Sequence, residues 1–323
     1  MSDKLKAFQI RVDGKILDYR LGKQLNLDYI KSFFKKRYFV KKLWSGGRHI
    51  LGILEKNNKN LFLKLATTEG ISELTKIEYN WNEQFNNLMP RKSSGFWVPQ
   101  NEDFGIYNGN LFYLITDRFE GRLLAQRPEK TNSTDFIDQI PAIINFSELI
   151  QKLNIVELTS KENPDYRERF FEKTKSWYND IPKDIIEKYQ VVDLLKVVEH
   201  GISKLKMKPR HGDFTPWHLF KLTSGQLGLI DGEHAKKNGV EYYDIGYFIQ
   251  RVFSVLENPN FAEKILSELI KKNYSLEKLI IILAARAIGG FLDESLKPSP
   301  DYTFCVKFKD WVINNNSSKE FIV

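Results

Sequence analysis

The stretch His211-Gly212-Asp213-Phe214-Thr215-Pro216-Trp217-His218 is followed, eighteen residues after its aspartate, by a second carboxylate in Ile230-Asp231-Gly232-Glu233. A short apolar run precedes Asp231, which we expect at the end of a strand, whereas Asp213 is expected on a loop. Phosphoryl transfer from a nucleotide uses such a pair, with one aspartate beside the attacking hydroxyl and one on the metal ion that holds the phosphates. The pattern predicts Asp213 as the catalytic carboxylate, which accepts the hydroxyl proton, and Asp231 as a ligand of Mg²⁺.

A glycine turn, Ser45-Gly46-Gly47-Arg48, lies between the two strand-like segments 38–44 and 49–55. Glycine lets the main chain approach a ligand closely, and successive backbone N–H groups bind phosphate oxygens. We therefore expect Ser45, Gly46 and Gly47 to contact the phosphates of a nucleotide. An ordinary hairpin turn is the alternative.

Lys64 is the one charged residue in the apolar strand-like segment 61–66. A lysine inside such a segment needs a partner if it is buried, and it is the expected cation for the nucleotide phosphates. Glu73 and Glu78 both lie on the predicted helix 71–85. We expect Glu78 to be the partner of Lys64, because the apolar side chains at helical spacing place Glu78 beside the buried face.

The composition is that of a globular protein, with 323 residues of which 42% are hydrophobic and 28% charged. The single cysteine, Cys305, excludes an internal disulfide and fits a cytoplasmic protein. Residues 1–11 contain no apolar segment of signal-peptide length. The most apolar run, 279–292, is short and contains Arg286, so we expect a buried helix and no membrane span.

The net charge of +8 is largely local, because the six basic residues of the segment Lys31–Lys42 account for all but +2 of it. Aromatic residues alternate with these charges, which could indicate a surface that binds nucleic acid. We favour a helix with a solvated basic face and expect no nucleic-acid partner. The sequence gives no expectation for the oligomeric state.

Three regions follow from the distribution of predicted elements. Residues 1–37 form an N-terminal extension with a hairpin around Asp13-Gly14 and a short helix. Residues 38–121 form a lobe with an antiparallel sheet and one helix, and residues 122–323 form a mostly helical lobe that contains the catalytic loop. The fold class is α+β, with a β-rich N-terminal lobe and a larger helical C-terminal lobe.

These motifs resemble the aminoglycoside phosphotransferase and choline kinase-like family, which has a bilobal protein kinase-like fold. The resemblance spans roughly residues 38–316. It implies that Asp213 is the catalytic aspartate, Asp231 the metal aspartate and Lys64 the phosphate lysine. It also implies that Asp244, at the start of an amphipathic helix, holds the catalytic loop through backbone hydrogen bonds. ATP and Mg²⁺ are the cofactors implied, and the γ-phosphate would pass to a hydroxyl of a small molecule.

His218 departs from this resemblance, because the family has Asn at its position. Asn offers a metal an oxygen ligand, whereas imidazole offers nitrogen, which Mg²⁺ accepts poorly. Three outcomes stay open: His218 donates a hydrogen bond to Asp213 and leaves a single metal on Asp231, it is a metal ligand that favours Mn²⁺, or it marks a catalytically impaired nucleotide-binding protein with a regulatory role.

The phosphate acceptor is the least defined part of the prediction, with an amino sugar, a sugar and an amino alcohol as the candidate classes. Four residues near the C-terminus could face a cationic acceptor: Asp293, Glu294, Asp301 and Tyr302. They are equally consistent with a solvated loop, which we favour.

Overall fold

The structure is a computed structural model that describes residues 5–92, 94–126, 138–156, 158 and 165–317. The chain divides into two compact units. The first unit comprises residues 1–122 and 220–235, and the second comprises residues 123–219 and 236–323. The predicted boundary near residue 121 lies next to this division, but the division also assigns the segment around Asp231 to the first unit.

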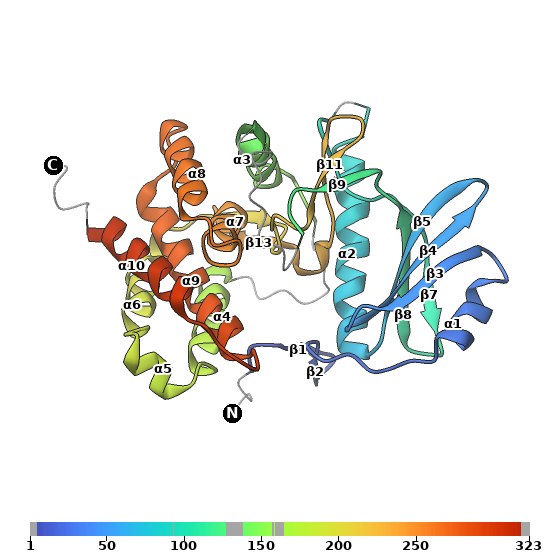
Figure 1. Cartoon of the computed structure of the whole chain (residues 1–323), viewed down its shortest axis with the longest axis horizontal. Coiled ribbons are helices and arrows are strands. Elements are labelled where there is room, and N and C mark those ends of the chain that lie inside the picture. The colour runs from blue at the N-terminus through green and yellow to red at the C-terminus, as the bar shows by residue number, and fades with distance from the viewer. Residues whose placement is uncertain (1–4, 93, 127–137, 157, 159–164, 318–323) are drawn as a thin grey trace. The chain divides into compact units, whose positions relative to one another are not determined.

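The first unit is built on a five-stranded antiparallel sheet with the strand order β3-β4-β5-β8-β7. Its strands are β3 (Phe39–Ser45), β4 (His49–Lys56), β5 (Lys59–Ala66), β7 (Asn101–Tyr107) and β8 (Leu111–Asp117). Two helices accompany it, α1 (Leu27–Phe34) and α2 (Glu69–Leu88) (Figure 1). Asn26 caps α1 and Thr68 caps α2 through side-chain oxygens that accept backbone N–H groups, which explains where both helices begin.

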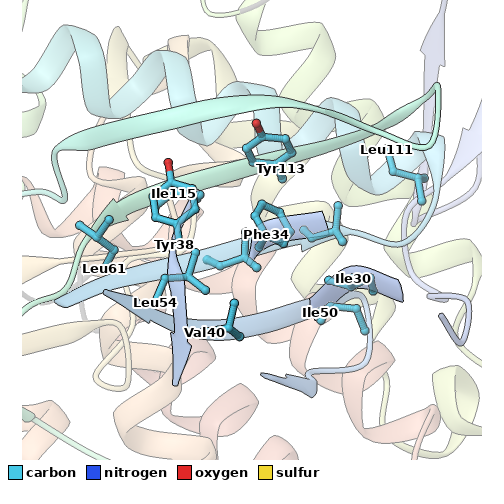
Figure 2. Close-up of a cluster of buried hydrophobic side chains, with 12 residues drawn as sticks. Ile30, Phe34, Tyr38, Val40, Ile50, Leu54, Leu61, Leu111, Tyr113 and Ile115 are labelled. Carbon is cyan, nitrogen blue, oxygen red and sulfur yellow. The ribbon is translucent and has the colours of Figure 1, made fainter. Parts of the chain in front are cut away.

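Strand alternation decides what lies on each face of this sheet. Leu61, Leu63 and Leu65 of β5 belong to the apolar core that Ile30 and Phe34 of α1 complete (Figure 2). Because neighbouring residues of a strand point to opposite faces, Lys64 points away from this core, towards α2. Because Ile30 and Phe34 lie in this core, α1, which was predicted as part of the N-terminal extension, belongs to the first unit.

The remaining elements of the first unit are short. The predicted hairpin is present as β1 (Gln9–Val12) and β2 (Lys15–Asp18), with positive φ at Asp13 and Gly14. A four-stranded sheet has the order β6-β12-β11-β9, in which β6 pairs with β12 in parallel. Its strands are β6 (Phe96–Trp97), β9 (Gly121–Leu123), β11 (Leu219–Leu222) and β12 (Leu227–Leu229), and the 3₁₀ helix η3 (Gly232–His234) follows.

The second unit is mostly helical, as predicted. Its helices are α3 (Ile140–Ile150), α4 (Tyr166–Asn179), α5 (Lys183–Lys188), α6 (Val192–Gly201), η2 (Ile202–Lys204), α7 (Tyr243–Ser254), α8 (Pro259–Lys271), α9 (Leu276–Ser295) and α10 (Thr303–Ser317). Helix α9 is buried over most of its length and packs against α4, α6, α7 and α10. β10 (Met207–Arg210) and β13 (Lys236–Val240) form a two-stranded antiparallel ribbon, and β10 leads directly into the loop that carries Asp213.

No helix within the described parts of the chain has the length and apolar character needed to cross a membrane.

Candidate active-site residues in the two units

Lys64 forms the centre of a buried charge cluster in the first unit. Its Nζ lies 2.5 Å from Glu78 Oε2 and 3.4 Å from Glu233 Oε2, and it also donates to Asp231 Oδ1. The ion pair expected between Lys64 and Glu78 is confirmed, whereas Glu73 pairs with Lys76 on the surface of α2. We call Lys64, Glu78, Asp231 and Glu233 the lysine–carboxylate cluster.

Burial and charge act in opposite directions on this cluster. Burial alone would lower the pKa of Lys64, but the charges of Asp231, Glu78 and Glu233 together raise it well above its ordinary value. Burial raises the pKa of Glu78 although Lys64 opposes the change. Burial and the charge of Asp231 would raise the pKa of Glu233 as well, but Lys64 and Arg48 outweigh them and lower it. Lys64 is therefore charged, and of the two glutamates it is Glu78 whose pKa is raised.

The backbone around Asp231 places its carboxylate at Lys64. Asp231 follows β12 with a φ of 69° and a ψ of 51°, in the left-handed region that few residues other than glycine adopt. At Gly232, an added Cβ would approach Cδ1 of Trp81 to 2.3 Å, so η3 lies directly against the indole ring of α2. A glycine after the aspartate is thus required for this close contact between η3 and α2.

The glycine turn lies in the first unit between β3 and β4. Ser45 ends β3, and Gly46 and Gly47 form the turn, in which Gly47 has a φ of 79°. The N–H of Gly46 donates to the carbonyl of His49 at 2.8 Å, so this group stabilises the turn itself. A Cβ at Gly22 would come within 2.1 Å of the Gly47 carbonyl oxygen, which shows that the segment after β2 packs on the turn.

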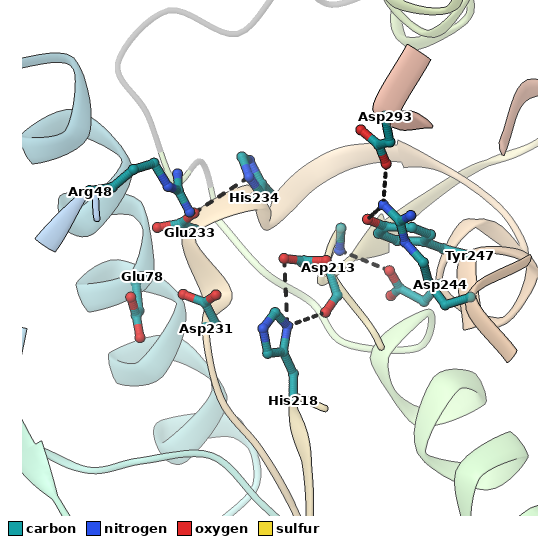
Figure 3. A network of polar contacts seen from close by, with 12 residues as sticks. Arg48, Glu78, Asp213, His218, Asp231, Glu233, His234, Asp244, Tyr247 and Asp293 are labelled. Atoms are coloured by element: carbon teal, nitrogen blue, oxygen red, sulfur yellow. Dashed lines mark hydrogen bonds and ion pairs between the residues drawn. The ribbon is translucent and has the colours of Figure 1, made fainter. Parts of the chain in front are cut away.

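Arg48 and Glu233 were not given roles from the sequence, yet Glu233 belongs to the lysine–carboxylate cluster and Arg48 pairs with it. Arg48 follows the glycine turn and forms an ion pair with Glu233, whose side chain is fully buried (Figure 3). The signal available in the sequence was the acidic pair Asp231 and Glu233 spaced by one glycine. Their convergence on Lys64 depends on the left-handed conformation of Asp231, which the sequence does not specify.

Asp213 lies in the second unit, on the loop between β10 and β11. Asp244, near the start of α7, accepts the backbone N–H groups of His211 and Gly212 at 2.8 Å each (Figure 3). The predicted support of the catalytic loop by Asp244 is confirmed. Burial raises the pKa of Asp244 to about 6 in spite of these two donors. Phe214 anchors the loop in the core of the second unit, because its ring is fully buried and contacts the rings of Phe146 and Phe248.

His218 contacts the residue expected to be catalytic. Its Nδ1 lies 3.0 Å from the backbone carbonyl oxygen of Asp213 and 3.5 Å from Oδ2 of the same residue. Because a carbonyl oxygen only accepts hydrogen bonds, this geometry assigns a proton to Nδ1 of His218. The imidazole therefore links Asp213 to the end of the loop that carries it.

Hard oxygen ligands for a divalent cation gather in the lysine–carboxylate cluster. One carboxylate oxygen each from Glu78, Asp231 and Glu233 lies within 4.8 Å of the others. Such oxygen donors suit Mg²⁺ or Mn²⁺. Lys64 occupies the space among these carboxylates, so a cation bound here would compete with its ammonium group.

Comparison with solved structures identifies the fold. The aminoglycoside phosphotransferase APH(4)-Ia aligns with a TM-score of 0.66 at 14% sequence identity, over 90% of this chain and 99% of that one. A variant of it in a ternary complex with ADP and hygromycin B gives a TM-score of 0.63 at 13% identity, over 89% and 98%. Choline kinase LicA from Streptococcus pneumoniae gives a TM-score of 0.55 at 17% identity, over 90% and 98%.

The chain therefore has the kinase-like fold found in small-molecule phosphotransferases, and the predicted fold class is confirmed. These structural neighbours are aminoglycoside and choline kinases, the two groups that the motifs resembled. No family model and no curated protein matches the sequence.

Proposed function

We propose that the protein is an ATP-dependent phosphotransferase that moves the γ-phosphate to a hydroxyl group of a small molecule. The observation that carries this proposal is the buried Lys64, which is paired with both Glu78 and Asp231. A strand lysine, a helix glutamate and a metal-binding aspartate are the parts that position the nucleotide phosphates in kinase-like enzymes. A structural neighbour that binds ADP supports a nucleotide as the ligand.

The first unit supplies the groups for the nucleotide. Lys64 would bind the phosphates once they replace one of its carboxylate partners, with Glu78 keeping the ammonium group in position. Asp231 would hold Mg²⁺, which when bound neutralises negative charge on the phosphates. The glycine turn from Ser45 to Gly47 would lie over the phosphates, and Arg48 would hold Glu233 in place.

The second unit supplies the group for the acceptor. Asp213 would orient the attacking hydroxyl and accept its proton as the bond to phosphorus forms. The two hydrogen bonds from the loop backbone to Asp244 fix the loop that carries Asp213. Asp213 itself is partly exposed, with 18% of its side chain accessible, as an acceptor-binding carboxylate requires.

His218 motivates a second candidate function, that of a nucleotide-binding protein without turnover. The contact between His218 Nδ1 and the Asp213 carbonyl favours the active enzyme, because the imidazole supports the loop. We expect His218→Asn to change the ratio of turnover with Mg²⁺ to turnover with Mn²⁺, since the substitution replaces a nitrogen donor with an oxygen donor. An unchanged ratio would remove His218 from the metal site.

The deciding experiment combines thermal stability with ADP release. We expect ATP with Mg²⁺ or Mn²⁺ to raise the melting temperature, because a ligand that binds the folded state stabilises it. ADP release that depends on an added hydroxyl acceptor would support the phosphotransferase. Stabilisation without ADP release for any acceptor would favour the non-catalytic alternative, and the absence of both would contradict the proposal.

A further inference from the structure

A second group of charged side chains, all of them cations, lies beside the catalytic loop in the second unit. The guanidinium of Arg210 lies 3.8 Å from the centre of the Tyr243 ring. Arg286 of α9 donates to the Tyr243 hydroxyl at 3.1 Å and lies 4.8 Å from the centre of the Trp177 ring. Lys173 of α4 lies 5.9 Å from the same Trp177 ring. Two aromatic rings thus connect three cations from three different elements.

A fourth cation belongs to this group through the ribbon register. Lys236 of β13 is the direct cross-strand partner of Arg210 of β10. Residues directly opposite in an antiparallel pair share a face, and like charges in such a pair repel each other. We call Lys173, Arg210, Lys236 and Arg286 the cation cluster.

The two arginines of the cation cluster have no acidic partner among the residues that the structure describes. Within the described ranges of the chain, no carboxylate lies at ion-pair distance from Arg210 or Arg286, and the Nε of each is buried without a hydrogen-bond acceptor. Arg286 is only 4% exposed. Aromatic rings hold a guanidinium in place but do not neutralise it, so a buried arginine without a carboxylate has unused capacity to bind an anion.

The pKa of Lys173 reflects the nearness of the other three cations. Burial and the charges of Lys236, Arg210 and Arg286 together lower the pKa of Lys173 to about 8, although Asp180 opposes the change. The cations are therefore close enough to repel one another. An anion among them would relieve this repulsion.

The cation cluster adjoins the residue that we assign to proton transfer. Arg210 precedes Asp213 by three residues, and its charge acts on Asp244, the residue that holds the loop. Arg286 lies 3.6 Å from the centre of the Tyr247 ring. Burial raises the pKa of Tyr247 to about 12, and Asp213 is close enough to contribute to the change.

The acids that could have faced a cationic acceptor are engaged elsewhere. Asp293 accepts from Arg251 at 2.6 Å, and Glu294 accepts the backbone N–H of Asp301 at 2.8 Å. Asp301 in turn accepts the backbone N–H of Thr303 at 2.9 Å. Asp293 and Glu294 lie within α9, and Glu294 is buried, so the solvated loop that we favoured for these two acids is wrong.

We infer that the phosphate acceptor is a hydroxyl compound with an anionic group, a carboxylate or a phosphate, which binds to Arg210 and Arg286. Arginine is suited to either group, because its planar guanidinium forms paired hydrogen bonds with two oxygens. The inference rests on the proposed phosphotransferase activity and specifies its substrate class. It differs from the amino sugars and amino alcohols that the resemblance suggested.

The first test compares acceptors that share a hydroxyl skeleton and differ in charge. One set is glycerol, D-glycerate and glycerol 3-phosphate, and the other is glucose, glucosamine, gluconate and glucose 6-phosphate. We expect an acidic member to show a kcat/KM for ADP release at least about tenfold above its neutral or amino counterpart. The carboxylate and phosphate members distinguish the two anionic groups. A preference for a neutral or amino member would overturn the inference.

The second test uses Arg210→Gln. Arg210 is only partly buried, so we expect this substitution to disturb folding less than a substitution of Arg286 would. We expect it to raise the KM for the acidic acceptor at least about tenfold while leaving the KM for ATP unchanged. Arg210→Lys should recover part of the loss. The control is Lys196→Gln, which removes an exposed cation of α6 that pairs with Asp193. An equal rise in both variants would contradict a specific site.

The third test measures binding without turnover. Inorganic phosphate and D-glycerate are titrated into the protein saturated with ADP, so that the nucleotide site is already filled. We expect either anion to raise the melting temperature of the wild type and of Lys196→Gln, but not of Arg210→Gln. The same shift in all three proteins would overturn the anion site. The nucleotide's own thermal shift and ADP release report separately on the proposed function.

Discussion

The lysine–carboxylate cluster and the cation cluster are both buried groups of charges, but their balance differs. In the first unit, Lys64 lies within ion-pair distance of three carboxylates, those of Glu78, Asp231 and Glu233. In the second unit, Arg210 and Arg286 have aromatic rings where a counter-ion would be expected. Paired charges of this kind stabilise a fold, and Lys64 can bind phosphate when the phosphate replaces one of its carboxylate partners. An unbalanced group costs stability and is explained best by a ligand that supplies the missing charge.

The largest effect is expected from Asp213→Asn, which tests whether the second unit carries the chemistry. The amide cannot accept the hydroxyl proton, so turnover should fall by about 10³-fold, within the range usual for loss of a general base. ATP should still raise the melting temperature, because the nucleotide is assigned to the first unit. ADP release at the wild-type rate would remove Asp213 from the mechanism, and loss of ATP binding would contradict the division of roles.

Lys64→Met tests the balance of the lysine–carboxylate cluster. The substitution leaves Glu78, Asp231 and Glu233 close together without their shared cation, and breaking a buried pair in this way costs about 3–5 kcal/mol. Chemical denaturation should show a loss of this size, together with loss of stabilisation by ATP.

The matched control for this variant is Lys59→Met, in a surface pair with Glu102 on the same sheet. Exposed pairs contribute about 0–1 kcal/mol, so the control should change the unfolding free energy little. An equal loss of unfolding free energy in the two variants would show that the ion pairs of Lys64 do not stabilise the lysine–carboxylate cluster.

Sequence patterns predicted the charge cluster of the first unit more completely than that of the second. The reason is that the patterns used for Lys64 and Glu78 each lie within a single strand or helix. The apolar strand-like segment around Lys64 indicated that this lysine needs a partner, and helical spacing selected Glu78 in preference to Glu73. Both rules operate within one element. The pair between Arg48 and Glu233 escaped prediction, because it requires the backbone turn at Asp231.

The cation cluster escaped prediction for a related reason. Its members come from α4, β10, β13 and α9, and no local pattern links four elements that are distant in the chain. The one local sign was Arg286 within an otherwise apolar helix. The acids near the C-terminus were candidates for binding a cationic acceptor because they are close together in sequence. In the structure, Asp293 pairs with Arg251 of α7, and Glu294 accepts the backbone N–H of Asp301.

His49 offers a pH test of the lysine–carboxylate cluster. Burial and the charge of Lys64 together lower the pKa of His49 to about 3, so the folded state keeps the imidazole neutral. The unfolded chain binds a proton at about 6.5. Between these values only the unfolded state is protonated, so His49 reduces stability as the pH falls through this window, by up to about 1.4 kcal/mol per pH unit.

The variant that isolates this effect is His49→Gln, whose amide can still reach the hydroxyl of Thr75. The difference in unfolding free energy between wild type and variant should shift in favour of the variant as the pH is lowered from 6.5 to 4.5. Other titrating groups affect both proteins alike and leave this difference unchanged. A difference that does not depend on pH would show that His49 is not held neutral.

The smallest effect, and the one with the opposite sign, is expected from Arg210→Gln in the absence of ligands. Removing a cation from the cation cluster relieves repulsion with Lys173 and Lys236, so the unfolding free energy should stay constant or rise by up to about 1 kcal/mol. The same neutralisation at Lys64 is expected to be strongly destabilising. If the Arg210→Gln protein is at least as stable as the wild type, the fold does not need Arg210, and a role in binding explains this charge beside the Asp213 loop. A lower affinity for the acidic acceptor in the same variant would identify the ligand of Arg210. A destabilised Arg210→Gln protein would instead assign the arginine to the fold.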